Sequence, residues 1–143
     1  MEISLLTEVT DEVVQAFAQL LPQLSSSAMI PTREQLQEIA DNESFLIARD
    51  PDLDGQIVGS LTLVTFRIPT GVRAWIEDVI VDTSMRGKGI GEALTRAALV
   101  RAAELGAKTV DLTSRPSRVA ANRLYQRVGF ELRQTNLYRY NLE

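Results

Sequence analysis

The residues best placed to do chemistry lie in the stretch SMRGKGIGEAL. Glycine occupies every second position, at Gly87, Gly89 and Gly91, and Arg86 and Lys88 stand among the glycines. Glycine disfavours a helix by about 1 kcal/mol relative to alanine, yet this run opens a helical apolar pattern. A helix N-terminus presents unpaired N–H groups and favours negative charge, and a bare backbone lets an anion approach. The stretch therefore predicts a phosphate-binding loop.

Other interpretations of the glycines are a plain turn with a solvated helix start or a different nucleotide motif. No Gly-Lys-Ser/Thr follows at the spacing of a Walker loop. A dinucleotide fingerprint is disfavoured because the preceding strand does not open a β-α-β series. It is disfavoured also because Thr113 and Ser114, rather than an acidic residue, end the next predicted strand.

Two carboxylates interrupt the apolar stretch 72–81, at Glu77 and Asp78. Unpaired carboxylates are costly in apolar surroundings, so we expect at least one to face a cavity. Strict alternation puts the two on opposite faces of a strand, although a β-bulge would change that phase. A salt bridge to Arg73 or Arg115 is the alternative role for Glu77.

The composition limits the remaining chemistry. The 143 residues are 45% apolar and 24% charged, with a net charge of −4, which argues weakly against nucleic-acid binding. There is no cysteine and no histidine, so thiolate or imidazole chemistry and the usual zinc ligands are excluded. An acidic start and the lack of a long apolar run predict a cytoplasmic protein with no membrane partner.

The elements that must position these residues follow from periodicity and capping. Thr32 and Gln35 form a capping box, and Gly106 and Gly129 end helices. The sequence predicts one domain over 1–143, of α/β (α+β) class, with a mixed, mostly antiparallel sheet of six to seven strands and about four helices. The expected strands are 3–7, 44–49, 56–67, 72–81, 108–113, 130–133 and 137–142, and the expected helices are 11–22, 32–41, 89–105 and 117–128.

Three stretches then resemble a known family. The run from Arg86 to Gly91 fits the Gln/Arg-x-x-Gly-x-Gly/Ala signature of the GNAT N-acetyltransferases. The preceding WIEDVIVDTSM is similar to the strand of that motif, and AANRLYQRVGFEL resembles the family's Asn-x-x-Leu-Tyr-x-x-x-Gly-Phe. The resemblance covers about 72–133, and before that it extends only to the order of elements. It implies the GNAT-like acyl-CoA N-acyltransferase fold.

The resemblance also implies where acetyl-CoA binds. In the family the fourth strand bulges and splays from the fifth, and pantetheine pairs with the exposed strand backbone. The loop amides would hold the pyrophosphate, and Asn122 would contact the cofactor arm. The implied cofactor-binding residues are Val79, Ile80, Val81, Arg86, Gly87, Lys88, Gly89, Ile90, Gly91, Thr113, Asn122 and Tyr125.

The resemblance makes Tyr125 the general acid that protonates the leaving thiolate. Its helical spacing with Ala121 and Val128 would also suit a core tyrosine. Glu77 is the expected base, with Asp78 or water as alternatives. No metal is implied.

The implied activity is transfer of acetyl to a primary amine in a ternary complex, without a covalent intermediate. A small-molecule acceptor is favoured over a peptide, and a non-catalytic acyl-CoA-binding regulatory module is the other alternative. The family also suggests a homodimer. The IEDV stretch resembles the glucosamine-phosphate branch, whose basic residues could correspond to Arg33, Arg67, Arg73 or Arg115.

Overall fold

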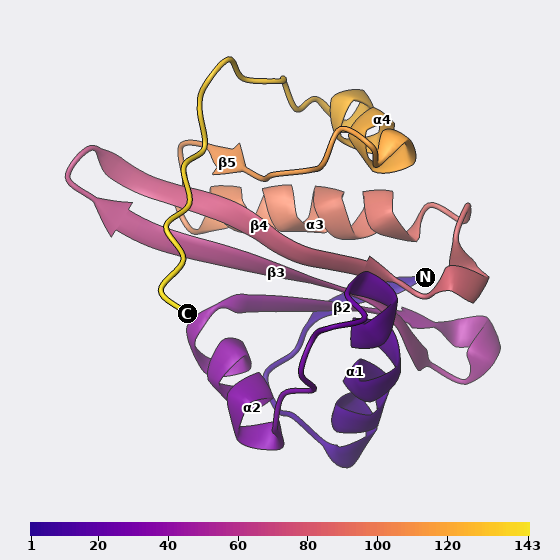
Figure 1. The fold of residues 1–143 in the computed structure, drawn as a ribbon. Coiled ribbons are helices and arrows are strands. Elements are labelled where there is room, and N and C mark those ends of the chain that lie inside the picture. The colour runs from indigo at the N-terminus through magenta and orange to yellow at the C-terminus, as the bar shows by residue number, and fades with distance from the viewer. The chain divides into compact units, whose positions relative to one another are not determined.

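The structure, a computed structural model, describes all residues from 1 to 143. It contains four α-helices and one five-stranded sheet, in which the strands lie side by side in chain order (Figure 1). The strands are β1 (Glu2–Leu5), β2 (Ser44–Asp50), β3 (Gln56–Ile68), β4 (Gly71–Val81) and β5 (Val110–Asp111), the helices are α1 (Asp11–Leu24), α2 (Arg33–Asn42), α3 (Ile90–Glu104) and α4 (Val119–Val128), and η1 (Pro51–Leu53) and η2 (Thr83–Met85) are short 3-10 turns.

The sheet is mixed and mostly antiparallel, as predicted. Strands β1 to β4 pair antiparallel, and β5 joins β4 in parallel after the α3 crossover. The predicted strand count of six to seven is wrong. The segments 130–133 and 137–142 form no strand, and the strand expected over 108–113 is reduced to two residues. Alternating apolar residues favour a strand, but a strand forms only where another strand accepts its backbone hydrogen bonds.

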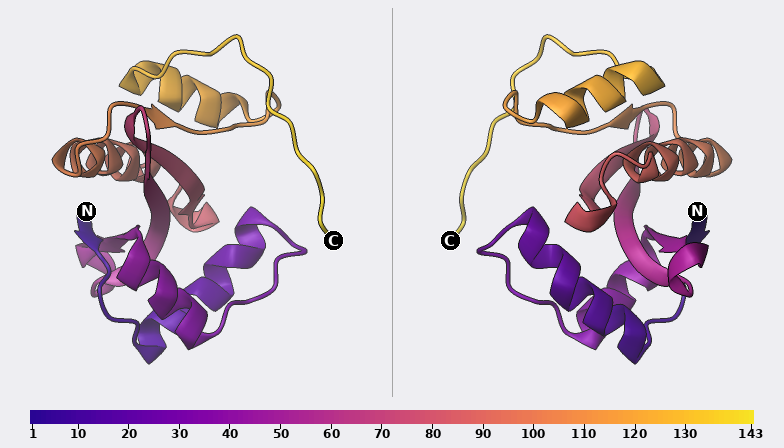
Figure 2. Two further views of the ribbon diagram at one scale, coloured as in Figure 1. Left: turned by 90° about the vertical axis from the view of Figure 1, so that its left-hand side faces the viewer. Right: turned by 90° about the vertical axis from the view of Figure 1, so that its right-hand side faces the viewer.

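The sheet has helices on both faces. Phe45, Ile47 and Ile80 belong to one core with side chains of α1 and α2. Gly59, on the other face, lies so close to α3 that an added Cβ would be 3.2 Å from both Ile90 Cγ2 and Leu94 Cδ1. Figures 1 and 2 show the same layering, with α3 on one side of the sheet and α1 and α2 on the other.

The helix starts agree only partly with the sequence. The Thr32–Gln35 capping box is present, with Gln35 N–H donating to Thr32 Oγ1 at 3.1 Å. Helix α1 starts at Asp11, as predicted, with Thr10 as its N-cap. The helix also continues two residues past Pro22, because proline in the last turn removes only one hydrogen bond.

The chain divides into two compact units, Met1–Thr113 and Ser114–Glu143. The first holds the whole sheet with α1, α2 and α3. The second holds α4 and the C-terminal segment. Helix α4 ends at Gly129, as predicted, and Tyr125 O accepts the N–H groups of both Gly129 and Phe130.

Candidate functional site

The glycine loop adopts a backbone conformation that L side chains rarely reach. Gly87 has a φ of +80° and Gly89 has a φ of +79°. An added Cβ at either position would meet nothing within 4 Å. The backbone angle therefore accounts for both glycines, and the space beside them is open to a ligand.

Helix α3 begins in a way that suits an anion. Its N-cap is Gly89, which has no side chain to cap the first turn. The backbone N–H groups of Gly89, Ile90 and Gly91 donate to no atom of the chain. Ile90 is buried and anchors the helix start, while Arg86 and Lys88 are exposed and form no ion pair. Free donors and a positive dipole end thus lie next to two exposed basic residues in the chain.

Strand β4 carries the bulge that alternation alone could not predict. Asp78 has a φ of +49°, and the pairing with β3 shifts there, so that Asp78 and Val79 together oppose one residue of β3. Ile76 pairs with Leu63 and Ile80 pairs with Ser60, which places these two isoleucines on opposite faces of the sheet. The bulge therefore reverses the phase of the strand just before the glycine loop.

Beyond Trp75, one edge of β4 has no strand beside it. Pairing with β5 is confined to Ala74 with Val110 and Trp75 with Asp111. No strand pairs with Ile76–Val81 on the side away from β3. An extended ligand with alternating amides could add there as a strand does, and this edge leads directly into the glycine loop. The segment includes Val79, Ile80 and Val81, which the sequence analysis assigned to pantetheine.

Glu77 and Asp78 are both exposed, and neither lines the groove described below. Glu77 pairs with Thr62, which pairs with Phe45, so Glu77 lies on the sheet face that α1 and α2 cover. It forms no salt bridge with Arg73, which instead contacts Thr70 Oγ1 at 3.4 Å.

Sequence reasoning missed Asp111. This residue pairs in parallel with Trp75, and Trp75 lies on the same face as Glu77 because they are two residues apart before the bulge. The register therefore places Trp75, Glu77 and Asp111 on one face of adjacent strands. The signal was present in the sequence, since Asp111 alternates with the apolar Val110 and Leu112.

The second unit carries the other two predicted residues. Tyr125 is 9% exposed and packs edge-on against Phe130, with ring centroids 5.9 Å apart. Burial raises the pKa of the Tyr125 phenol above its ordinary value of 10.0, and the positive charge of Arg118 partly offsets this. The phenol is therefore protonated at neutral pH and can donate a proton.

Asn122 is already engaged with its own unit. Its Nδ2 donates to Arg115 O at 2.9 Å and to Arg118 O at 2.8 Å, which holds the turn that precedes α4. Both amide protons are used, so only Oδ1 remains to contact a ligand. Thr113 is exposed at the end of the first unit, and the adjacent Ser114 Oγ is buried without a hydrogen-bond partner.

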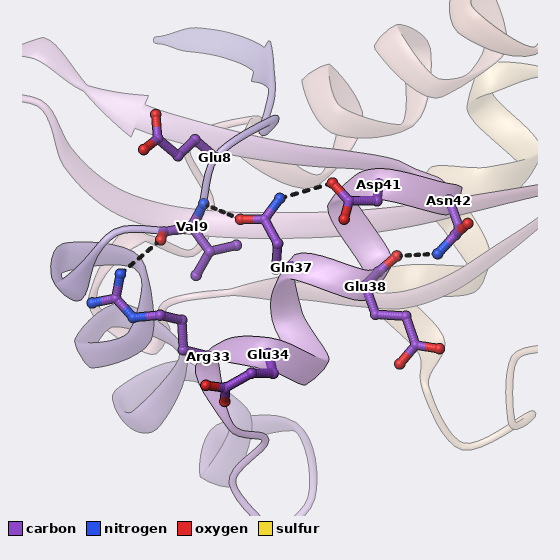
Figure 3. A pocket seen from close by; sticks show the side chains of 8 residues that line it. All are labelled: Glu8, Val9, Arg33, Glu34, Gln37, Glu38, Asp41 and Asn42. Carbon is purple, nitrogen blue, oxygen red and sulfur yellow. Dashed lines mark hydrogen bonds between the residues drawn. The ribbon is translucent and has the colours of Figure 1, made fainter.

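A groove of about 460 Å³ lies elsewhere, between α2 and the connection from β1 to α1 (Figure 3). Gln37 of α2 forms hydrogen bonds to the connection before α1. Its Oε1 accepts Val9 N–H at 2.9 Å, and its Nε2 donates to Thr7 O and to Asp41 Oδ1, each at 2.9 Å. Of the residues that the sequence singled out, Arg33 alone lines this groove, which lies where α2 contacts the chain before α1. The lining residues are Glu8, Val9, Arg33, Glu34, Gln37, Glu38, Asp41 and Asn42.

A bulged strand with an open edge, followed by a helix start with free N–H groups, is an arrangement suited to an acyl-CoA-binding protein. Comparison with known families agrees: residues 8–130 match the model of the acetyltransferase (GNAT) family. The chain belongs to this family, whose members use acetyl-CoA. No helix of the chain has the length and apolar character needed to cross a bilayer.

Individual relatives add detail. A mycothiol acetyltransferase from Kytococcus sedentarius is 31% identical over 117 residues, which cover 82% of this chain but 38% of that protein. An aminoglycoside acetyltransferase from an uncultured soil metagenomic sample superposes with a TM-score of 0.82 at 24% identity, covering 99% of this chain and 96% of the other. Glucosamine-6-phosphate N-acetyltransferase from Arabidopsis thaliana gives 0.79 at 21% identity, covering 97% of each chain. The two structural likenesses establish the fold.

Proposed function

We propose that the chain is an acetyl-CoA-dependent N-acetyltransferase acting on a primary amine. The observation that carries the proposal is the continuous backbone surface from the open edge of β4 into the start of α3. The edge at Ile76–Val81 offers strand-like pairing to the amides of pantetheine, and Gly89–Gly91 offer free N–H groups to the pyrophosphate. At the pyrophosphate end of the proposed site, Gly87 supplies the turn and Arg86 and Lys88 supply positive charge.

The proposed chemistry is direct transfer. The neutral amine nitrogen attacks the thioester carbonyl carbon, a C–N bond forms, and the C–S bond breaks as the tetrahedral intermediate collapses. Tyr125 gives its phenolic proton to the departing thiolate, and its raised pKa keeps that proton available at neutral pH. The amine proton leaves to Glu77, to Asp78 or to water. Asn122 Oδ1 and Thr113 are proposed to contact the cofactor arm.

A small-molecule amine is the proposed acceptor. The names of the mycothiol and aminoglycoside acetyltransferases support this choice over a peptide. The face that carries Trp75, Glu77 and Asp111 offers an aromatic ring and two carboxylates, groups that attract a cationic amine. Panel assays that detect free CoA would identify the acceptor among amino sugars, polyamines, aminoglycosides, amino acids and peptides.

The test of the cofactor site compares two glycines that share one conformation. Gly89→Asp places a carboxylate where we propose the pyrophosphate binds. Gly55→Asp makes the same change in the turn between β2 and β3, where φ is +76° and a Cβ likewise meets nothing within 4 Å. By calorimetry, Gly89→Asp should weaken acetyl-CoA binding by at least about 100-fold, because like charges in close contact repel. Gly55→Asp should bind like the wild type.

Three outcomes decide the proposal. Absence of acetyl-CoA binding to the wild type would reject the cofactor. Full affinity in Gly89→Asp would reject the loop assignment. Binding without turnover on any amine would favour the non-catalytic acyl-CoA module.

A further inference from the structure

In the turn before the glycine loop, the four consecutive backbone N–H groups of residues 82–85 each donate a hydrogen bond. Asp82 N–H donates to Val58 O at 2.8 Å, and Met85 N–H donates to Asp82 O at 2.9 Å. Ser84 donates its N–H to Asp82 Oδ1 at 3.0 Å and its hydroxyl to the same oxygen at 2.9 Å. These acceptors come from the neighbouring strand β3 or from the turn itself.

Thr83 differs from its neighbours in the source of its acceptor. Its N–H donates to Gln23 Oε1 at 2.8 Å, across 60 positions of the sequence. Gln23 lies in the last turn of α1, a helix that packs on the sheet and has no other hydrogen bond to the turn. One side chain of α1 therefore holds the first residue of η2.

The Gln23 side chain is itself held in place. Its Nε2 donates to Gln19 O at 3.1 Å, so both ends of the amide are bonded. Leu20, one turn before Leu24, is buried and fixes this end of α1 in the core. The preceding Pro22 has a restricted φ, which further limits motion of the helix end. Gln23 thus offers Thr83 an acceptor at a defined position.

The loop that follows depends on its two ends. Residues 86–89 are exposed, whereas Met85 before them and Ile90 after them are buried. An anion binds more tightly to backbone N–H groups that are already ordered. If the loop must become ordered during binding, the entropic cost lowers the affinity. The Gln23–Thr83 hydrogen bond is the one restraint on the first end of the loop that comes from α1, and it is solvent-accessible.

We infer that Gln23 is a positioning residue for the phosphate-binding loop and raises the affinity for acetyl-CoA without contacting it. This inference rests on the proposed function. The Gln23–Thr83 hydrogen bond links α1, near the start of the first unit in sequence, to the turn that leads into the loop. Gln23 contributes nothing to the signature from Arg86 to Gly91, which explains why no motif in the sequence includes it.

The test removes the acceptor and keeps the length of the side chain. Gln23→Met preserves a helix-favouring, unbranched residue but leaves Thr83 N–H without its partner. Gln19→Met is the matched control, since Gln19 lies one turn earlier, is exposed and contributes only its backbone carbonyl to the contact. Gln23→Glu retains an acceptor oxygen, and Gln23→Asn keeps the amide but is one methylene too short.

Binding is measured with two probes, acetyl-CoA and S-acetylpantetheine, which lacks the pyrophosphate. Titrations at about 0.3 M salt screen the charge added by Gln23→Glu. We expect Gln23→Met and Gln23→Asn to raise the Kd for acetyl-CoA about 3- to 10-fold, the usual worth of one hydrogen bond. Gln19→Met and Gln23→Glu should stay within about twofold of the wild type. The affinity for S-acetylpantetheine should not change in any variant.

The results separate the two proposals. Equal acetyl-CoA affinity in the wild type, Gln23→Met and Gln23→Asn would overturn the role of Gln23 and leave the proposed function intact. Equal weakening of both probes, or failure of Gln23→Glu to restore binding, would show a general structural effect and also overturn it. A wild type that binds no acetyl-CoA would reject the proposed function and this inference with it.

Discussion

The two units of the chain differ in how their residues are held. In Met1–Thr113, buried side chains of the three strands β2, β3 and β4 and of three helices form the core on both faces of the sheet. In Ser114–Glu143, Tyr125 is the one buried apolar residue, and Leu132 and Leu142 are 91% and 92% exposed. The proposed cofactor loop is thus fixed by a sheet, whereas the proposed proton donor is fixed by one helix and its contact with Phe130.

The difference shows where backbone chemistry and side-chain chemistry reside in this protein. Binding pyrophosphate through N–H groups needs a rigid backbone, which the paired strands and the buried Ile90 provide. Donating a proton needs a single phenol with a suitable pKa, which a short helix can carry. The following predictions test this contrast.

The largest expected effect is on stability. Leu61→Ala removes a fully buried side chain from the central strand β3 and should lower the free energy of unfolding by about 2–5 kcal/mol. Leu142→Ala makes the same change at a 92% exposed position and should change it by less than about 0.5 kcal/mol. Urea unfolding measures both. Similar losses for the two variants would show that the C-terminal segment packs as tightly as the sheet.

The second prediction concerns catalysis by the second unit. Once an acceptor is found, Tyr125→Phe should lower kcat by about 100-fold, because the thiolate loses its proton donor. The Kd for acetyl-CoA should remain near that of the wild type, since the loop belongs to the first unit. Steady-state kinetics and calorimetry separate these quantities. A parallel loss of affinity would instead assign Tyr125 a packing role.

A smaller effect is expected at a helix cap within the first unit. Thr32→Ala removes the side chain that accepts Gln35 N–H and should lower the free energy of unfolding by about 1 kcal/mol. Thr10 is the matched control, because it occupies the N-cap of α1 but its side chain makes no capping bond. Thr10→Ala should therefore lower the free energy of unfolding by less than Thr32→Ala does, as measured by urea unfolding. The reverse order would contradict the capping assignments.

The smallest effect is a dependence of stability on alkaline pH. The folded-state pKa of Tyr125 is raised, so the unfolded chain loses this proton first as the pH rises through the ordinary value of 10.0. The free energy of unfolding should therefore fall as the pH rises through 10, and Tyr125→Phe should make that fall shallower. Tyr138→Phe, at an 87% exposed position, is the control and should leave the slope unchanged. An identical slope in Tyr125→Phe would exclude this linkage.

Much of the fold follows from local patterns. The capping box at Thr32, the helix end at Gly129 and the three long strands β2, β3 and β4 were all predicted, because each depends on neighbouring residues. The phase of β4 could not be predicted, because the resemblance implies a bulge in this strand but its position at Asp78 becomes visible only in the register with β3. The predicted strands after Gly129 were wrong for a related reason, since alternation cannot supply a pairing partner.

The family signature, the glycine loop and the start of α3 follow from local sequence alone, because short-range sterics and capping dictate these features. The tertiary structure decided which edge of β4 stays unpaired, that Asp111 shares a face with Glu77, and that Gln23 reaches Thr83. Each of these depends on strand register or on helix packing between distant segments. Contacts of that kind are set by the whole fold, so no local pattern encodes them.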